Sequence, residues 1–225
     1  MHWQESDTLP PVVAPDVVDV RYRIRCKALP VDHARDLRSA LLAVWPWLAD
    51  EPLAGVHTIH GAESGNGWIR PEDPTTYLPL SKRTRLALRL PYHRLEEARE
   101  LSGVTLQIGP DSMVIEDNRL HPLQAQGTVF ARYVAIEDED EEEFLGLCAE
   151  QLKGIGIEAP RMMAGRTHLV AGGERALHCR SLMLDGLDPE QSVNLQRQGL
   201  GPERLLGCGL FLPHKSIAPV ATPSR

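Results

Sequence analysis

A segment near the end of the chain has the composition of an anion-binding loop. Its four glycines, Gly199, Gly201, Gly207 and Gly209, follow the pattern G-x-G-x5-G-x-G, with Arg204 between the two pairs. A backbone without Cβ atoms can adopt positive φ and approach another chain closely. Its N–H groups and one guanidinium could therefore contact phosphates. A tight turn between a helix and a strand is the plainer interpretation, but such a turn does not need two Gly-x-Gly pairs.

Two familiar phosphate-binding motifs do not fit this segment. A Walker loop ends in Gly-Lys followed by Ser or Thr, which the segment lacks. A dinucleotide-binding fingerprint leads from a strand into a helix. Here the glycines follow an expected helix and precede an apolar strand, so the loop belongs to another class.

The segment resembles the C-terminal glycine-rich loop of the CRISPR-associated endoribonucleases that cut repeat RNA, members of the RAMP superfamily. Gly199-Leu200-Gly201 matches the Gly-apolar-Gly start of that loop, and Arg204 matches its basic residue. Gly207-Cys208-Gly209 matches the Gly-x-Gly that precedes the last strand. The resemblance implies that the loop holds the RNA backbone beside the cut. Valine at Gly201 or Gly207 should then damage RNA binding more than stability.

The resemblance also implies a reaction and its partners. The family cleaves precursor transcripts into guide RNAs without a metal ion or cofactor: a 2′-oxygen attacks the adjacent phosphate and leaves a 2′,3′-cyclic phosphate and a 5′-hydroxyl. CRISPR repeat RNA would be the substrate, with other subunits of a CRISPR effector complex as further candidate partners. Two alternatives stay open, a non-catalytic RAMP subunit and a generic RNA-binding protein with duplicated ferredoxin-like domains.

Such a reaction needs a base, an acid and cations on the phosphorane, and histidine is the natural acid or base near neutral pH. His57 is the first choice because Gly55-Val56-His57-Thr58-Ile59 gives its ring an apolar frame. By resemblance, the catalytic histidine lies in the first helix or just after it, where this chain has Arg38, and His57 is the nearest histidine downstream. We predict that His57 is catalytic; a buried, hydrogen-bonded strand histidine is the alternative.

His33 is the second candidate for catalysis. It follows Asp32, the expected N-cap of the first helix, where the helix dipole disfavours a protonated ring and suits a general base. A plain capping-region residue fits equally well. His60 would lie on the opposite face of a regular strand from His57, so we expect no shared zinc ion and no metal site.

Basic residues gather on two expected strands. Arg83, Arg85 and Arg89 share one face of the segment from Arg83 to Leu90, and Lys82 precedes them. Arg21, Arg23 and Arg25 share one face of the first strand. Each face is either a phosphate-contacting surface or a solvated one, and we predict that Lys82, Arg83 and Arg85 bind RNA. The three aromatic residues placed for base stacking are Tyr22, Phe130 and Tyr133, and aromatic content is only 5%, which favours recognition by shape and phosphates.

The net charge of -7 opposes RNA binding at first sight. One unbroken acidic run from Glu137 to Glu143 carries all of that excess, so the rest of the chain is neutral. Acidic runs are typical of solvated loops or helix starts. A local basic surface governs RNA binding more than the total charge does.

Length and composition bound the remaining possibilities. The 225 residues suit one large domain or two small ones. No apolar run approaches the length of a membrane span, and the first residues lack a secretion signal. The four cysteines are far apart, which favours free thiols in a reducing cytoplasm. We therefore expect a cytoplasmic protein without a membrane segment.

The first half of the chain predicts the order β-α-β-β-α-β. The expected strands are residues 17–27, 56–60, 83–90 and 104–108, and the expected helices run from Asp32 to Pro46 and from Tyr92 to Leu101. A strand alternates apolar and polar residues, whereas the helices show apolar positions such as Leu37, Leu41 and Val44.

The second half repeats that order. Its expected strands are 128–136, 166–170, 177–184 and 208–212, and its expected helices are 141–155 and 189–198, the latter capped by Asp188. The fold class is therefore α+β, with two tandem ferredoxin-like domains. We assign residues 1–16 to a flexible tail, 17–122 and 123–213 to the two domains, and 214–225 to a C-terminal tail.

Overall fold

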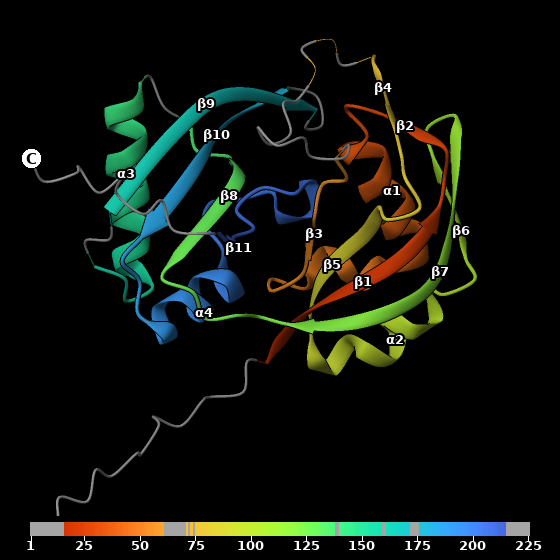
Figure 1. The fold of residues 1–225 in the computed structure, drawn as a ribbon, viewed down its shortest axis with the longest axis horizontal. Helices are drawn as coiled ribbons and strands as arrows, with labels where there is room; N and C mark the ends of the chain where they lie inside the picture. The colour runs from red at the N-terminus through yellow and green to blue at the C-terminus, as the bar shows by residue number, and fades with distance from the viewer. Residues whose placement is uncertain are drawn as a thin grey trace, which may run out of the picture.

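The computed structural model describes residues 16–60, 71, 73, 75–137, 140–158, 161–171 and 176–214. They form two lobes that lie side by side (Figure 1). The lobe formed by residues 16–122, here the N-lobe, contains a five-stranded antiparallel sheet. The lobe formed by residues 123–214, the C-lobe, contains a four-stranded one. The predicted tails fall almost wholly outside the described residues.

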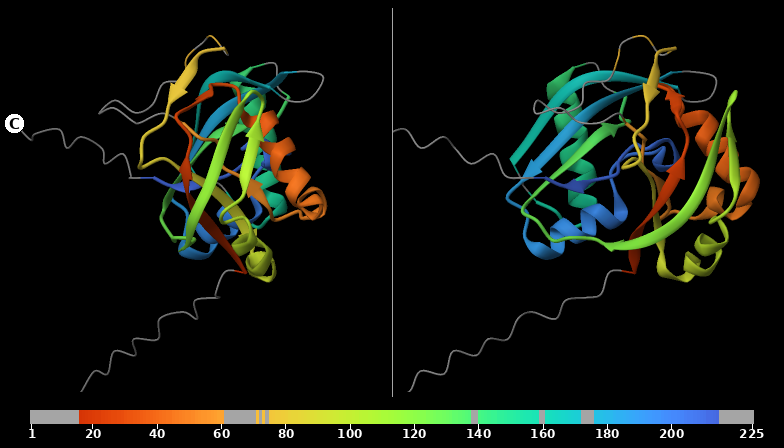
Figure 2. Two further views of the ribbon diagram at one scale, coloured as in Figure 1. Left: turned by 90° about the vertical axis from the view of Figure 1, so that its right-hand side faces the viewer. Right: turned by 45° about the vertical axis from the view of Figure 1, so that its right-hand side comes forward.

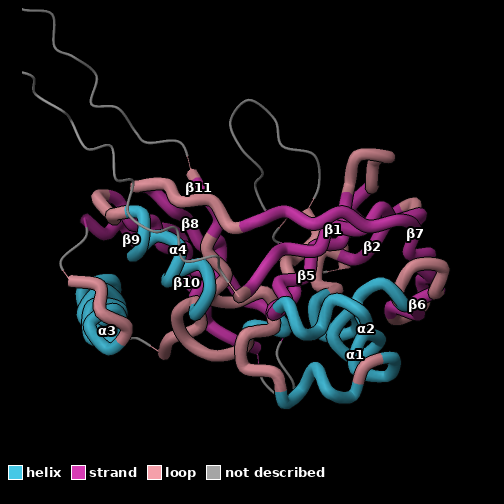
Figure 3. The backbone as a smooth tube through the Cα atoms, turned by 90° about the horizontal axis from the view of Figure 1, so that it is seen from below, coloured by secondary structure: helices cyan, strands magenta, loops and turns pink. Residues whose placement is uncertain are grey.

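The strands of the N-lobe sheet lie in the order β3-β5-β1-β7-β6. Helices α1 and α2 cover one face of this sheet (Figure 2, Figure 3). A two-stranded sheet of β2 and β4 lies beside it. The elements are β1 (Val17–Arg25), β2 (Ala28–Pro30), α1 (Ala34–Val44), the 3-10 helix η1 (Pro46–Asp50), β3 (Gly55–Val56), β4 (Tyr77–Pro79), β5 (Arg85–Pro91), η2 (Tyr92–Arg94), α2 (Leu95–Glu100), β6 (Thr105–Ile108) and β7 (Asp111–Pro122).

Alternation on the central strands builds the N-lobe core. Val18, Val20 and Tyr22 of β1 are buried, and they pack with Leu37 and Leu41 of α1. Side chains on the other face of β1, such as Asp19 and Arg21, point away from α1 and α2 because strand residues alternate between faces. The two helices thus leave the second face of the sheet uncovered, and this is the face that the C-lobe approaches.

Three details of the N-lobe differ from the prediction. The strand expected at 56–60 ends at Val56, and β7 is a full strand that pairs with β1 where no element was expected. Asp32 does not cap α1: the N-cap position is His33, and it makes no side-chain capping bond.

The strands of the C-lobe sheet lie in the order β11-β8-β10-β9. With helices after the first and third of these strands along the chain, this is the predicted β-α-β-β-α-β order. The elements are β8 (Thr128–Val134), α3 (Glu141–Gly154), β9 (Arg161–Ala171), β10 (Ala176–Asp185), α4 (Pro189–Gln198), η3 (Arg204–Leu206) and β11 (Leu212–Pro213). The last strand is only two residues long, shorter than the predicted 208–212.

Helix signals in the C-lobe were read correctly. Asp188 caps α4: its carboxylate accepts from the Gln191 N–H, and Pro189 occupies the first turn. Asp140 caps α3 in the same way, with Glu141, Glu142 and Glu143 in the first turn. The last four residues of the acidic run, from Asp140 to Glu143, therefore begin a helix, where the dipole favours negative charge.

The two lobes share a buried cluster. Tyr133, Cys179 and Cys208 of the C-lobe pack with Ala34 of α1 and Leu206 of η3. The carboxylate of Asp16 also binds Arg197 of α4, with Oδ2 2.8 Å from one guanidinium nitrogen. All strands of the larger sheet fall within 17–122 and all of the smaller within 123–213, and independent folding of either range stays a prediction. In the described part of the chain, no helix is long and apolar enough to cross a membrane.

Candidate active site between the two lobes

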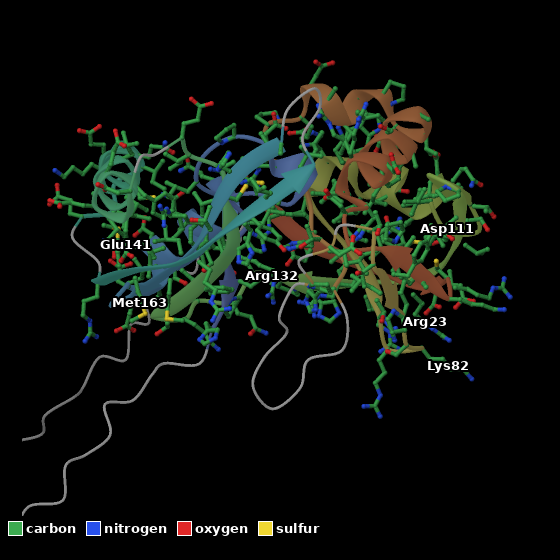
Figure 4. All side chains as sticks on the ribbon, turned by 90° about the horizontal axis from the view of Figure 1, so that it is seen from above. Arg23, Lys82, Asp111, Arg132, Glu141 and Met163 are labelled. Atoms are coloured by element: carbon green, nitrogen blue, oxygen red, sulfur yellow. The ribbon has the colours of Figure 1, made fainter. Side chains whose placement is uncertain are left out.

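A cleft of about 820 Å³ opens where the two sheets meet. It is lined by β1, by the chain after β3, by β5 and the turn before it, by β8 and by the residues around β11. Figure 4 shows Arg132 of β8 between the two lobes, whereas Arg23 and Lys82 lie at the outer end of the N-lobe. The cleft contains Arg83 and Arg85 of the predicted RNA-binding set, but Lys82 does not line it.

The cleft is strongly cationic although the chain is acidic. Its described lining holds four guanidinium groups and a single carboxylate, that of Asp19. The four guanidinium groups belong to Arg21, Arg83, Arg85 and Arg132. A groove with this charge and low-dielectric walls concentrates polyanions. Arg23 and Arg25, by contrast, lie within 4 Å of the Glu116 carboxylate outside the cleft.

His57 lies in the wall of this cleft, directly after β3. Its backbone N–H donates to the carbonyl of Ala87 at 3.0 Å, which fixes its position along β5. Its Nε2 lies 3.2 Å from Oδ1 of Asp19, and 12% of its side chain is exposed. Among the residues that the structure describes, none binds Nδ1. His57 is thus fixed through its backbone N–H and Nε2, and Nδ1 is available in a cationic cleft.

Asp19 is bound from two directions. Besides His57, the Arg89 guanidinium donates from Nε to Oδ1 at 2.8 Å and from a terminal nitrogen to Oδ2 at 3.1 Å. Arg89, assigned from sequence to a basic face, is completely buried. Burial opposes ionisation of Asp19, but attraction to His57 and Arg89 outweighs it and holds the pKa of this carboxyl well below its ordinary value.

The pKa of His57 is lowered, chiefly by burial. Asp19 raises this pKa, while Arg89 and Arg21 lower it. The balance favours the neutral imidazole at pH 7. A neutral ring with a lone pair on Nδ1 can accept a proton from a hydroxyl group.

The structure places His33 in a different environment. It is 2% exposed, its Nδ1 is 2.7 Å from the Pro30 carbonyl, and its Nε2 accepts from the backbone N–H of Ile59 at 3.2 Å. Both ring nitrogens therefore bind backbone groups and hold α1 to the chain after β3. These contacts favour a structural role for His33 over the catalytic role predicted from sequence.

His60 lines the same cleft as His57. The expected separation onto opposite strand faces does not apply, because β3 ends at Val56. Even so, the described residues contain no cluster of three or more histidine, cysteine or carboxylate groups arranged to hold a metal ion.

The glycine-rich loop lies between the lobes beside β3 (Figure 1). All four glycines have positive φ. A Cβ on Gly209 would lie 2.1 Å from the Leu200 carbonyl oxygen, and one on Gly207 would lie 2.5 Å from the Thr58 methyl group. The close approach that the glycines permit is thus to the protein's own chain. Of the four, only Gly207 is part of the cleft wall.

Arg204 also serves the loop itself. Its guanidinium donates to the carbonyls of Ala54 at 3.1 Å, Leu53 at 3.0 Å, Gln198 at 2.5 Å and Arg197 at 3.1 Å. Burial lowers its pKa to about 10, which leaves it protonated at neutral pH. Four N–H donors tie the loop to the segment before β3 and to the end of α4. These contacts give Arg204 a structural role, and its contact with RNA stays a prediction.

Arg38, at the position where the resembled family has its helix histidine, lies elsewhere. It faces a small cavity of about 230 Å³ between α1, η1 and the glycine-rich loop. Its guanidinium lies 3.8 Å from Glu203, and the described lining contains no histidine. The larger cleft is therefore the candidate site.

Sequence reasoning missed two residues of the site. Asp19 and Arg132 line the cleft from strands of different lobes. Arg89, predicted from sequence to lie on a basic face, instead binds the Asp19 carboxylate. Asp19 carried one signal: a carboxylate in a strand flanked by valines on both sides. Its partner could not be found without the strand register.

Fold and site define a class: a tandem α+β protein with two antiparallel sheets, each backed by two helices, and a cleft suited to a polyanion between them. Comparison with known proteins gives the family. The family model for Cas6, described as "Cas6 Crispr", matches residues 18–216. The chain therefore belongs to the Cas6 family, and the resemblance inferred from the glycine-rich loop is confirmed.

Individual relatives agree with this assignment. The chain is 29% identical over 209 residues to the CRISPR-associated endonuclease Cas6 of Myxococcus xanthus (strain DK1622), covering 92% of this chain and 86% of that one. A solved structure of a CRISPR associated protein Cas6 superposes with a TM-score of 0.61 at 10% identity, covering 88% of this chain and all of the other. A RAMP protein described as binding different RNA substrates superposes at 0.59 with 14% identity, covering 87% and 98%. The predicted fold class is confirmed.

Proposed function

We propose that this protein is an endoribonuclease that binds CRISPR repeat RNA in the cleft between its lobes and cleaves it beside His57. One observation carries the proposal: His57 lies in a cleft whose described lining holds four guanidinium groups and one carboxylate. The relative from Myxococcus xanthus is named an endonuclease, and family membership supports the same activity here.

The RNA backbone would follow the guanidinium groups across the cleft. Arg21 and Arg85 lie on the N-lobe side of the cleft and Arg132 on the C-lobe side. An RNA strand that passes between these arginines would therefore contact both lobes. Such contacts hold the phosphates and stabilise charge that develops on the phosphorane. Phe130, at the C-lobe edge of the cleft, offers one face for base stacking.

His57 would act on the 2′-hydroxyl. Nδ1 accepts its proton, the 2′-oxygen attacks the adjacent phosphorus, and the bond from phosphorus to the 5′-oxygen breaks. Water donates a proton to the leaving 5′-oxygen, so the products are a 2′,3′-cyclic phosphate and a 5′-hydroxyl. His57 could instead supply that last proton, since the same group can serve either step. No metal ion takes part in this sequence.

The proposed setting is the cytoplasm, with repeat RNA as partner and other CRISPR effector subunits as further candidates. The test incubates the purified full chain with a transcript of its own repeat in EDTA. We expect one cut per repeat, and products that carry cyclic phosphate and 5′-hydroxyl ends. Tight binding without cleavage, with or without divalent ions, would identify a non-catalytic RNA-binding subunit instead.

A further inference from the structure

Asp19 occupies a position that the proposed chemistry does not by itself require. It lies on β1, directly opposite Arg89 on β5 in the strand register, and it is 4% exposed. Its Oδ1 is the acceptor for both His57 Nε2 at 3.2 Å and Arg89 Nε at 2.8 Å. A buried carboxylate placed so that one oxygen serves two cationic or donor groups constrains both of them.

We infer that Asp19 is the positioning residue of His57 and that Arg89 anchors this pair to the C-lobe. The inference rests on the proposed role of His57. In this role Asp19 does not contact RNA. It acts only by fixing the orientation and the tautomer of the His57 imidazole ring.

The tautomer follows from the acceptor. An ionised carboxylate offers lone pairs but no proton, so the ring nitrogen beside Asp19 must carry the hydrogen. The neutral ring is therefore protonated on Nε2, and its lone pair is on Nδ1. Without this acceptor the imidazole would divide between two tautomers and turn about its Cβ–Cγ bond, which would misplace the base.

Arg89 connects this arrangement with the other lobe. One of its terminal nitrogens donates to the carbonyl of Gln196 at 2.6 Å and to that of Phe211 at 3.1 Å. Gln196 belongs to α4, and Phe211 immediately precedes β11. The guanidinium thus bridges backbone of the C-lobe and the carboxylate of the N-lobe. The orientation of His57 consequently depends on how the lobes dock.

The first experiment needs no substitution at Asp19. The full chain is labelled with ¹⁵N-histidine, and His57 is assigned by comparison with His57→Gln. Two-bond proton–nitrogen correlation at pH 8 should show the Nε2–H tautomer for His57. The Nδ1–H tautomer, or an average of the two, would overturn the inference, and this result does not depend on whether the protein cuts RNA.

The second experiment compares two aspartate variants in single-turnover cleavage at saturating RNA. Asp19→Asn should slow cleavage by about 100-fold, the size expected when a reacting group loses its alignment, with RNA affinity unchanged or higher. Asp16→Asn is the matched control. It breaks another Asp–Arg pair between the lobes, that of Asp16 with Arg197, without touching His57, and it should cleave at the wild-type rate.

A double variant separates positioning from general damage. If Asp19 acts through His57, then Asp19→Asn combined with His57→Ala cleaves no more slowly than His57→Ala alone. Additive losses, a wild-type rate for Asp19→Asn, or an equal loss in Asp16→Asn would each contradict the inference. Should Asp19→Asn fail to fold, the tautomer measurement decides. If the wild-type protein does not cleave repeat RNA, the proposed function fails, whereas the tautomer measurement still tests the Asp19–His57 contact.

Discussion

Asp19 and Arg89 are direct partners in the register of β1 and β5, and their side chains form two hydrogen bonds, of 2.8 and 3.1 Å. The guanidinium is fully buried, and the carboxylate nearly so. Breaking one side of such a pair leaves a buried charge without its partner. The pair therefore links the ionisation of a single carboxyl to the integrity of the interface between the lobes.

The first prediction concerns stability against pH. The pKa of His57 in the folded protein lies below its ordinary value of 6.5. The contribution of neutral His57 to folding stability is therefore complete above pH 6.5 and is lost as the pH falls through the lowered pKa. The pKa of Asp19 is depressed from 3.8, so its contribution is present above pH 4 and is lost in stronger acid. Melting temperatures from pH 8 to pH 2 should fall in two stages, the second of them below pH 4. His57→Gln should remove the first, and its persistence in that variant would contradict this assignment.

Replacing His57 tests the chemistry. His57→Ala should reduce cleavage about 100-fold or more, because a positioned acid or base contributes ~10²–10⁴, while RNA affinity stays near wild type. His93→Ala, at an exposed histidine bound to Glu51, is the control and should cleave normally. Full activity in His57→Ala would remove it from the mechanism, and His60, which shares the cleft, would be tested next.

The cationic lining should govern the salt dependence of binding. Arg83→Gln with Arg85→Gln should weaken RNA affinity and reduce the log–log salt slope by about 1.4, taking ~0.7 for each single-strand phosphate contact. The control, Arg23→Gln with Arg25→Gln, removes the same charge from a surface where both arginines face Glu116. Equal slopes for the two double variants would show that the cleft residues are merely solvated.

For the glycine-rich loop, the close contacts with the protein's own chain favour a role in stability over the RNA contact predicted from sequence. Gly207→Val should lower the free energy of unfolding by about 2 kcal/mol or more, because positive φ costs ~1–3 kcal/mol in a non-glycine residue and the Cβ meets Thr58 and the Val56 carbonyl. Gly103→Ala has positive φ and open space around its Cβ, so it measures the backbone cost alone. Wild-type stability with lost affinity in Gly207→Val would restore the RNA-contact interpretation.

Base stacking can be tested at one residue. Tyr22 and Tyr133 are buried, which leaves Phe130 as the cleft aromatic among the three considered from sequence. Phe130→Ala should weaken RNA binding about tenfold, since stacking on an aromatic ring contributes ~1–3 kcal/mol per base, and Phe130→Trp should retain it. Tyr92→Ala, an exposed aromatic outside the cleft lining, is the matched control. Unchanged affinity in Phe130→Ala would exclude this contact.

Local patterns predicted most of the fold. The capping residues Asp188 and Pro189 placed the start of α4, and apolar alternation placed β1 and β5, because each signal lies within a few neighbouring residues. The short strands β3 and β11 were predicted too long, and the polar strand β7 was not predicted. Their pairing is decided by what lies beside them in the sheet, as in β7, which combines Glu116, Asp117 and Asn118 with only a few apolar residues.

The site was predictable in part. His57, Arg83 and Arg85 were found because their residue types suit the chemistry and because they lie on strands or strand ends. Arg89 was assigned to a basic face, either phosphate-contacting or solvated, and Asp19 drew no assignment. The C-lobe covers that face, and the pair joins residues 70 positions apart. Sequence alternation reports which face a residue is on, but not what will cover it.

The contacts of Arg89 also set an order of events during protein synthesis. His57, Asp19 and Arg89 all belong to the first part of the chain, yet the two carbonyls that complete the arginine's hydrogen bonds lie 107 and 122 residues further on. A nascent chain that has not yet released Phe211 from the ribosome holds a histidine without its finished support. The support of His57 is thus completed last, and incomplete translation products would carry the proposed catalytic histidine without the contacts that hold Arg89 and Asp19 in place.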